Sequence, residues 1–146
     1  MVQRGGPSPR PIRFIPNQNI PAREALEKLI EVPTTEGIDR LFAACFEGSL
    51  VVDITGSQPG STPRARTIAT TTGEQVLPLF TSTDELRTAV PRQQRARVQM
   101  LVLPGREAFA LIDNADFVAV QIDAGSLAQV ITRSFVTRAL FGERTA

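Results

Sequence analysis

The chain has 146 residues, the length of a single domain with one apolar core. Sixteen Lys and Arg residues stand against fifteen Asp and Glu residues, so the overall charge indicates neither a nucleic-acid nor a membrane partner. The sequence contains no His and one Cys, so it lacks the commonest general base and metal ligand and cannot form a disulfide within the chain.

The chain begins with a segment rich in Pro, Gly and Arg. Residues 1–18 have a composition that neither buries apolar area nor forms backbone ladders. We predict a disordered basic leader over these residues and one domain over residues 19–146. The alternative is that the leader is a basic arm that contacts a partner.

Two amphipathic helices are predicted next. Apolar residues recur at helical spacing over residues 22–31, with charged residues between them and Pro21 in the first turn. A second apolar stripe over residues 38–46 ends at Gly48, a typical helix stop. Cys45 lies on this stripe, so we expect its thiol to be buried and unreactive.

The spacing then changes to that of strands. Residues 50–54 and 75–80 are predicted strands, separated by a loop rich in Gly, Ser and Pro over residues 55–64. A returning strand is predicted over residues 66–71, and the short connections favour an antiparallel meander of all three. Pro78 cannot donate a backbone hydrogen bond, so we expect its strand at a sheet edge or a bulge.

A capping box marks the next helix. Ser82 and Glu85 have the spacing of reciprocal caps, which predicts a helix over residues 83–89. Three further elements are predicted, in order a strand, a helix and a strand that is apolar on both sides and therefore interior: residues 98–103, 104–112 and 117–122.

Residues 126–141 carry a broad apolar arc at helical spacing and are predicted to form one last helix. The arc includes a basic side chain, so part of it is expected to contact something other than the core. The predicted protein-contact surface on this helix consists of Leu127, Ile131, Phe135, Arg138 and Phe141.

The order of these elements and four sequence blocks resemble the SseB-type N-terminal domain, of a bacterial family named for enhanced serine sensitivity. The blocks are Leu-Pro-Leu-Phe-Thr-Ser at 77–82, Asp-Glu-Leu-Arg at 84–87, Leu-Pro-Gly-Arg-Glu at 103–107 and Ala-Asp-Phe-Val-Ala-Val at 115–120. The resemblance covers residues 19–123, and the first block is its most specific element. It implies a mixed sheet flanked by helices, and it carries over no catalytic residues. The chain departs from the family where Ile122-Asp123-Ala124-Gly125 replaces the usual Asn-Pro, and in its long loop over residues 55–64.

Charged side chains suggest one candidate contact. Three arginines are the candidates for binding an anion or an acidic partner, because a guanidinium group can pair bidentately with a carboxylate or a phosphate: Arg92, Arg95 and Arg97. The alternative is that they form a solvated connection. No aromatic residue is interleaved with them, so nucleic-acid binding is not expected. Three aspartates match no calcium-loop spacing and are expected at solvated ends of helices and strands: Asp113, Asp116 and Asp123.

These observations predict an α+β domain with a mixed sheet of about five strands flanked by about five helices. No catalytic residue, metal site or cofactor is predicted. The favoured function is a non-catalytic protein-interaction or adaptor domain that binds a protein partner or a second copy of itself. A subunit of a larger secretion or phage-like assembly, and an enzyme working without histidine, remain as alternatives. No stretch approaches the roughly 20 apolar residues of a membrane span, and we expect a cytoplasmic protein.

Overall fold

The computed structural model describes residues 18–142. The leader predicted for residues 1–18 therefore lies outside the described residues, apart from Gln18. The elements follow in the order α1 (Ile20–Glu31), α2 (Thr35–Glu47), β2 (Ser49–Asp53), β3 (Ile68–Ala69), β4 (Gln75–Phe80), α3 (Thr83–Ala89), the 3-10 helix η2 (Arg92–Arg97), β5 (Met100–Pro104), α4 (Gly105–Ala110), the 3-10 helix η3 (Leu111–Asn114), β6 (Phe117–Ile122), β7 (Gln129–Thr132) and α5 (Arg133–Phe141).

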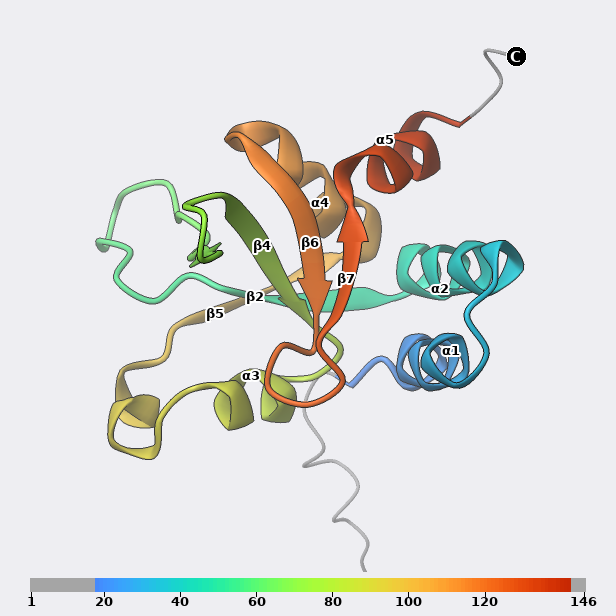
Figure 1. Ribbon diagram of the computed structural model, residues 1–146. Helices are drawn as coiled ribbons and strands as arrows, with labels where there is room; N and C mark the ends of the chain where they lie inside the picture. The colour runs from blue at the N-terminus through green and yellow to red at the C-terminus, as the bar shows by residue number, and fades with distance from the viewer. Residues whose placement is uncertain (1–17, 143–146) are drawn as a thin grey trace, which may run out of the picture.

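A mixed sheet of six strands forms the centre of the described part of the chain. Its order is β5-β2-β4-β6-β7, with β3 paired to β4 beside β2. Neighbouring strands run antiparallel except β4 and β6, which run parallel. Figure 1 shows β7 on the side of the sheet that faces the α1–α2 pair. The predicted α+β class with a mixed, helix-flanked sheet is confirmed.

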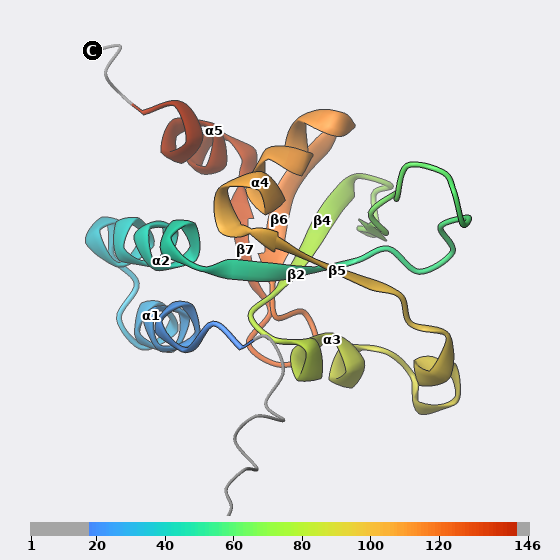
Figure 2. The ribbon, with the colours of Figure 1, turned by 180° about the vertical axis from the view of Figure 1, so that it is seen from behind.

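The two faces of the sheet bury different apolar clusters. In β2, Leu50 and Val52 belong to a large core shared with α1, α2, α4 and α5, whereas Val51 belongs to a small cluster with α3. Alternation along a strand explains this division, because successive side chains point to opposite faces. Figure 2 shows the large-core side, with α4 in front of the sheet.

The predicted N-terminal helices are confirmed, with Pro21 and Gly48 in their expected places. α1 has Pro21 in its first turn, and Asn19 caps it by accepting from the Ala22 N–H at 3.1 Å. α2 ends at Gly48 and buries Cys45, as its stripe predicts. Where α4 begins against the end of α2, a Cβ on Gly105 would lie 1.8 Å from the Cys45 carbonyl oxygen. Only glycine permits this approach of two backbones.

The predicted antiparallel meander is wrong. β4 pairs directly with β2, through Val51 with Phe80 and Val52 with Leu79. The strand predicted over residues 66–71 is reduced to the two residues of β3, which extend the same edge of β4. The loop after β2 is long enough to carry the chain past β4, so the middle segment does not need to lie between the other two strands.

The edge position predicted for Pro78 is also wrong, because β4 lies inside the sheet and its register shift falls between Gln75 and Val76. The Leu79 carbonyl accepts from the Asp123 N–H at 2.9 Å, so the backbone groups of Leu79 face β6. Those of Pro78 face the opposite side by alternation. On that side of β4, Pro78 lies between the residues that pair with β2 and those that pair with β3. No strand is paired with Pro78 there, so its missing N–H costs the sheet no hydrogen bond.

The single helix predicted over residues 126–141 is wrong. Residues 129–132 form β7, which pairs antiparallel with β6, and a helix begins only at Arg133. Asp123 and Ala128 adopt positive φ angles of 54° and 51°, so the chain turns sharply between β6 and β7. The β-branched run Val130-Ile131-Thr132 favours a strand, and its apolar spacing also fits a helix.

Candidate functional site

The structure separates the five residues predicted to form one contact surface. Leu127 lies in the turn before β7, Ile131 is buried on β7, and the other three lie on α5. The guanidinium of Arg138 lies over the Phe135 ring, 5.5 Å from its centroid. Ile131 and Phe135 do come together, on the wall of one groove. The proposed contact role of these residues stays a prediction.

This β7 groove runs between the edge of the sheet and the corner where α1 passes into α2. Its volume is about 600 Å³. It is lined by Leu29, Ile30, Pro33, Thr34, Thr35, Ile38, Gln129, Val130, Ile131, Thr132 and Phe135. None of these side chains is charged, and Ile30 and Val130 remain 40% and 48% exposed. The groove therefore presents an open apolar surface beside a strand.

Backbone groups of β7 line the same groove. The Asp123 N–H faces β4, so by alternation Val120 and Ile122 direct their backbone groups to β7. Their partners Ile131 and Gln129 face β6, which leaves the backbone of Val130 directed away from the sheet. The Val130 carbonyl accepts from the Gln129 side chain at 3.0 Å. β7 thus offers an uncharged edge to which another strand can be added.

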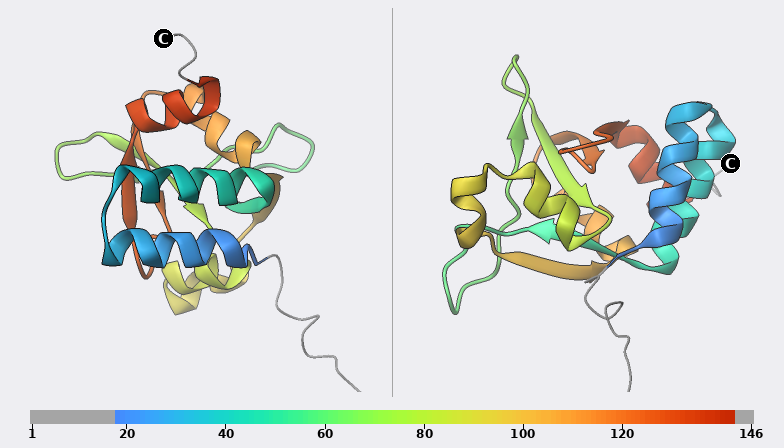
Figure 3. Two further views of the ribbon diagram at one scale, coloured as in Figure 1. Left: turned by 90° about the vertical axis from the view of Figure 1, so that its right-hand side faces the viewer. Right: turned by 90° about the horizontal axis from the view of Figure 1, so that it is seen from below.

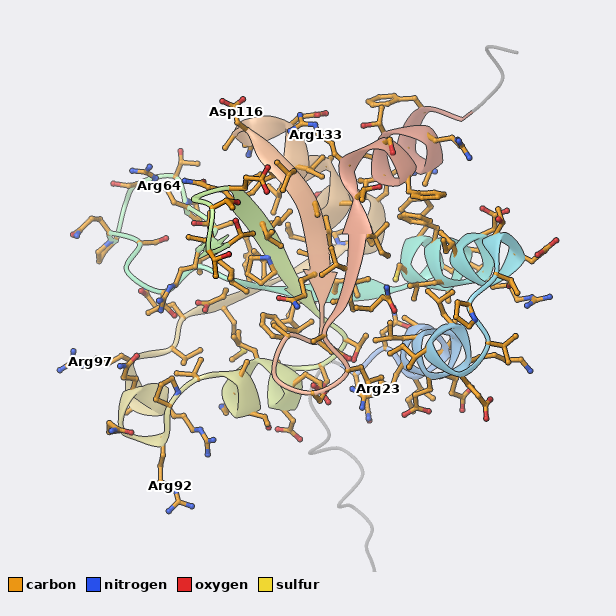
Figure 4. The ribbon with its side chains drawn as sticks, viewed as in Figure 1. Arg23, Arg64, Arg92, Arg97, Asp116 and Arg133 are labelled. Atoms are coloured by element: carbon orange, nitrogen blue, oxygen red, sulfur yellow. The ribbon has the colours of Figure 1, made fainter. Side chains whose placement is uncertain are left out.

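A second cluster ties α1 to the carboxyl ends of β4 and β6. The Arg23 Nη1 atom donates to Glu85 Oε2 at 2.6 Å and to Asp123 Oδ2 at 2.8 Å. Asp123 also accepts from the Thr81 N–H and hydroxyl, each at 2.8 Å. The Ser126 hydroxyl donates to Glu85 Oε1 at 2.7 Å. Figure 4 shows Arg23 reaching from α1 toward the turn that follows β6.

Asp123 is completely buried, so the expectation of a solvated strand end is wrong for this residue. Burial raises the pKa of its carboxyl above the ordinary value, and Glu85 adds to this, while the hydrogen bonds from Thr81 and Arg23 lower it. Both carboxylate oxygens are occupied by protein donors. This arrangement fastens three segments together and leaves Asp123 no oxygen facing a ligand, so we assign it a structural role.

Sequence reasoning missed this cluster because its members are distant in the chain. Arg23 and Asp123 are 100 residues apart, and no local spacing links them. The capping box at Ser82 and Glu85 is the one part of this cluster that the sequence indicates. Ser82 caps α3 as predicted, accepting from the Glu85 N–H at 3.1 Å, and the Glu85 carboxylate takes part in the Arg23 cluster.

The three candidate arginines lie on η2, a 3-10 helix with no buried residue. Figure 4 shows the side chains of Arg92 and Arg97 pointing outward in different directions. The Arg95 Nε atom donates to the Val90 carbonyl at 3.1 Å. Their predicted role as an anion or acidic-partner contact stays a prediction.

The expected burial of the Cys45 thiol is confirmed. Burial, followed by the negative charge of Asp123, raises the pKa of Cys45 to about 12. Within residues 18–142, no group of three or more Cys, Asp or Glu side chains is placed to hold a metal ion. No helix in that range is long and apolar enough to cross a bilayer.

Comparison with known proteins identifies one family. A family model described as the SseB protein N-terminal domain matches residues 23–138. The matched range includes most of α1, the whole sheet and most of α5, and so extends past the C-terminal end of the stretch that carries the sequence resemblance. No curated protein and no solved structure matches the chain significantly.

Proposed function

The chain belongs to the family of the SseB protein N-terminal domain, and from this premise we propose that it is a non-catalytic protein-interaction domain that works as an adaptor. The β7 groove receives an extended, uncharged segment of a partner protein, which adds to the sheet beside β7. The proposal places this interaction in the cytoplasm, where the unpaired Cys45 stays reduced.

The observation that carries the proposal is the uncharged edge of β7 inside an apolar groove. Native proteins usually protect a sheet edge with charges, prolines or bulges, because an open edge pairs with other strands. β7 has the sequence Gln-Val-Ile-Thr, which contains neither a charge nor a proline. In strand addition, main-chain hydrogen bonds give affinity and apolar pockets give specificity, and the β7 groove offers both.

The α1–α2 corner supports the same interpretation. Ile30 lines the groove and exposes 40% of its surface, although α1 has a buried face that could hold an apolar residue, and Val32 in the same corner exposes 53%. Ile30 and Val130 form an apolar strip on the two walls of the groove. A partner segment with apolar side chains would remove this strip from water.

A selection from a random peptide library displayed on phage tests the proposal with the purified chain as bait. We expect the retained peptides to be uncharged and rich in β-branched residues. Val130→Lys places a charge at the groove, so binding of these peptides should weaken about tenfold or more, because the ammonium loses water on binding. Val130 is half exposed, so this variant keeps its fold.

The matched control is Val102→Lys on β5, the opposite edge of the sheet, where Val102 is similarly exposed. The control should bind the selected peptides as the unchanged chain does. The proposal fails if Val130→Lys binds them with unchanged affinity, or if both variants lose binding equally.

A further inference from the structure

One end of the molecule carries five arginines. The loop of residues 55–67 supplies Arg64 and Arg66, and η2 supplies Arg92, Arg95 and Arg97. Neither segment itself contains Asp or Glu. Figures 1 and 3 show this loop and η2 at the same end of the molecule, opposite the α1–α2 pair. We call this surface the arginine end.

These arginines differ from Arg23, Arg87 and Arg133 in what they contact. Arg23 pairs with three carboxylates, Arg87 with Asp84, and Arg133 with Asp113. Within residues 18–142, the five guanidinium groups of the arginine end form no ion pair, and all five residues are exposed. Their charges therefore remain free for a ligand that brings its own negative charge.

The loop that presents Arg64 and Arg66 is fastened to the sheet. The Gly56 N–H donates to the Gln99 side chain at 2.7 Å, and the Arg64 N–H donates to the Ser57 hydroxyl at 2.9 Å. The Arg66 N–H donates to the Asp53 carbonyl at 2.8 Å. These bonds hold the backbone of the loop at both arginines in place before a partner arrives, which reduces the backbone entropy lost on binding.

A cavity of about 670 Å³ lies beneath this loop. Arg64 and Arg66 are part of its lining, and no carboxylate is. Its apolar wall consists of Val52, Ile54, Leu101, Leu103, Leu111 and Phe117. The arginine end therefore combines positive charge with a hollow that accepts an apolar side chain.

The opposite end has the opposite charge. Residues 20–47, which contain α1 and α2, carry six acidic and three basic side chains. A molecule with charge separated in this way orients an acidic partner toward its basic end during the encounter.

We propose that the arginine end is a second contact surface, which binds an acidic segment of a partner protein whose carboxylates alternate with apolar side chains. Arginine forks pair bidentately with carboxylates, and the cavity takes an apolar side chain from between them. Neither segment of the arginine end contains an aromatic residue on which bases could stack, nor a large apolar residue that could enter a bilayer. An acidic polypeptide therefore fits this surface better than nucleic acid or lipid.

Fluorescence anisotropy tests this proposal with the full chain and a labelled peptide of glutamates spaced by leucines. The matched probe has glutamine in place of every glutamate. We expect the chain to bind the glutamate peptide and not the glutamine peptide, with affinity falling as salt is raised. The triple variant Arg92→Ser, Arg95→Ser, Arg97→Ser should weaken binding about tenfold, since each exposed pair contributes up to about fivefold.

A second variant, Arg64→Ser with Arg66→Ser, tests the loop and should weaken binding about fivefold or more. The control is Arg40→Ser, which removes an exposed arginine from α2 and should leave the affinity unchanged. All these residues are exposed, so thermal unfolding followed by circular dichroism should show no loss of fold.

Four outcomes overturn the proposal. The first is that the glutamate and glutamine peptides bind equally, and the second is that Arg40→Ser loses as much affinity as the arginine variants. The third is that a DNA oligonucleotide or a phosphatidylserine vesicle binds more tightly than the glutamate peptide and that the arginine variants abolish this binding. The fourth is that the chain associates with itself in a salt-sensitive way that the arginine variants abolish. The last would make a second copy of the chain the occupant. Because the β7 groove shares no residue with the arginine end, Val130→Lys should leave the glutamate peptide bound, so the two proposals can fail separately.

Discussion

Replacing Asp123 by alanine should remove a buried polar link between α1 and the end of the sheet. The carboxylate accepts two hydrogen bonds from Thr81 and one from Arg23, and Asp123 is completely buried. Asp123→Ala leaves the Thr81 N–H and hydroxyl without their acceptor in the interior. Each such orphaned group costs about 1–3 kcal/mol.

These costs set the expected loss of stability. Removing one partner of a buried ion pair typically costs about 3–5 kcal/mol. The raised pKa of Asp123 shows that burying its charge is itself unfavourable, so alanine recovers part of the loss. We therefore expect the free energy of unfolding to fall by about 3 kcal/mol, which lowers the melting temperature by about 10 °C for a domain of this size.

Far-ultraviolet circular dichroism in urea measures this change, since the chain has no Trp or Tyr to report unfolding by fluorescence. Asp113→Ala is the matched control, because Asp113 pairs with Arg133 at 3.0 Å on the surface and its side chain is 51% exposed. The control should lose no more than about 1 kcal/mol. Equal losses in the two variants would refute the assignment of Asp123 as a buried fastening.

Three further predictions concern the core. Iodoacetamide should label Cys45 slowly in the folded chain and quickly in urea, because the raised pKa of about 12 suppresses the thiolate. Mass spectrometry measures the labelling rate, and fast labelling of the folded chain would contradict this prediction. Gly105→Ala should lower the free energy of unfolding by about 3 kcal/mol, because the added Cβ meets the Cys45 carbonyl; Gly60→Ala, which meets no neighbouring atom, should cost about 1 kcal/mol for its positive φ. Burial raises the pKa of Asp123 in the folded chain above 3.8, so the proton on its carboxyl contributes its full stability below pH 3.8, and this contribution is lost as the pH rises through the folded pKa. Urea titrations should therefore show that the free energy of unfolding, relative to that of Asp123→Asn, falls as the pH rises over that range. A free energy that rises instead would contradict the raised pKa.

The sequence predicted those elements whose signals are local. Pro21, Gly48 and Ser82 mark helix ends by the chemistry of a single turn, and all three ends are found where they were expected. Capping and helical periodicity depend on residues within a few positions of each other. For the same reason the position of Cys45 on the apolar stripe of α2 predicts its burial, which the structure confirms.

Features that depend on distant partners could not be predicted in this way. Pro78 looks like an edge residue because a proline lacks a donor, and only the gap between β2 and β3 makes an interior position acceptable. Val130, Ile131 and Phe135 have the spacing of a helix, and pairing with β6 decides that the first two form a strand. Tertiary contacts often override local preference in this way.

The candidate site shows the same division. The apolar character of Ile131 and Phe135 is visible in the sequence. The α1–α2 corner that forms the other wall of the β7 groove is about a hundred residues away in the chain. The arginines of η2 were likewise visible as a cluster. The loop that carries Arg64 and Arg66 reaches the same end of the molecule only through the fold.

Amide hydrogen exchange at Val130, followed by NMR in the presence and absence of a peptide selected by the β7 groove, tests the central claim most directly. If a partner segment adds as a strand beside β7, the outward Val130 N–H gains an acceptor and its exchange should slow by about tenfold or more when the peptide is saturating. Unchanged exchange at Val130 while the peptide is bound, or protection confined to residues 92–97, would contradict strand addition at this edge.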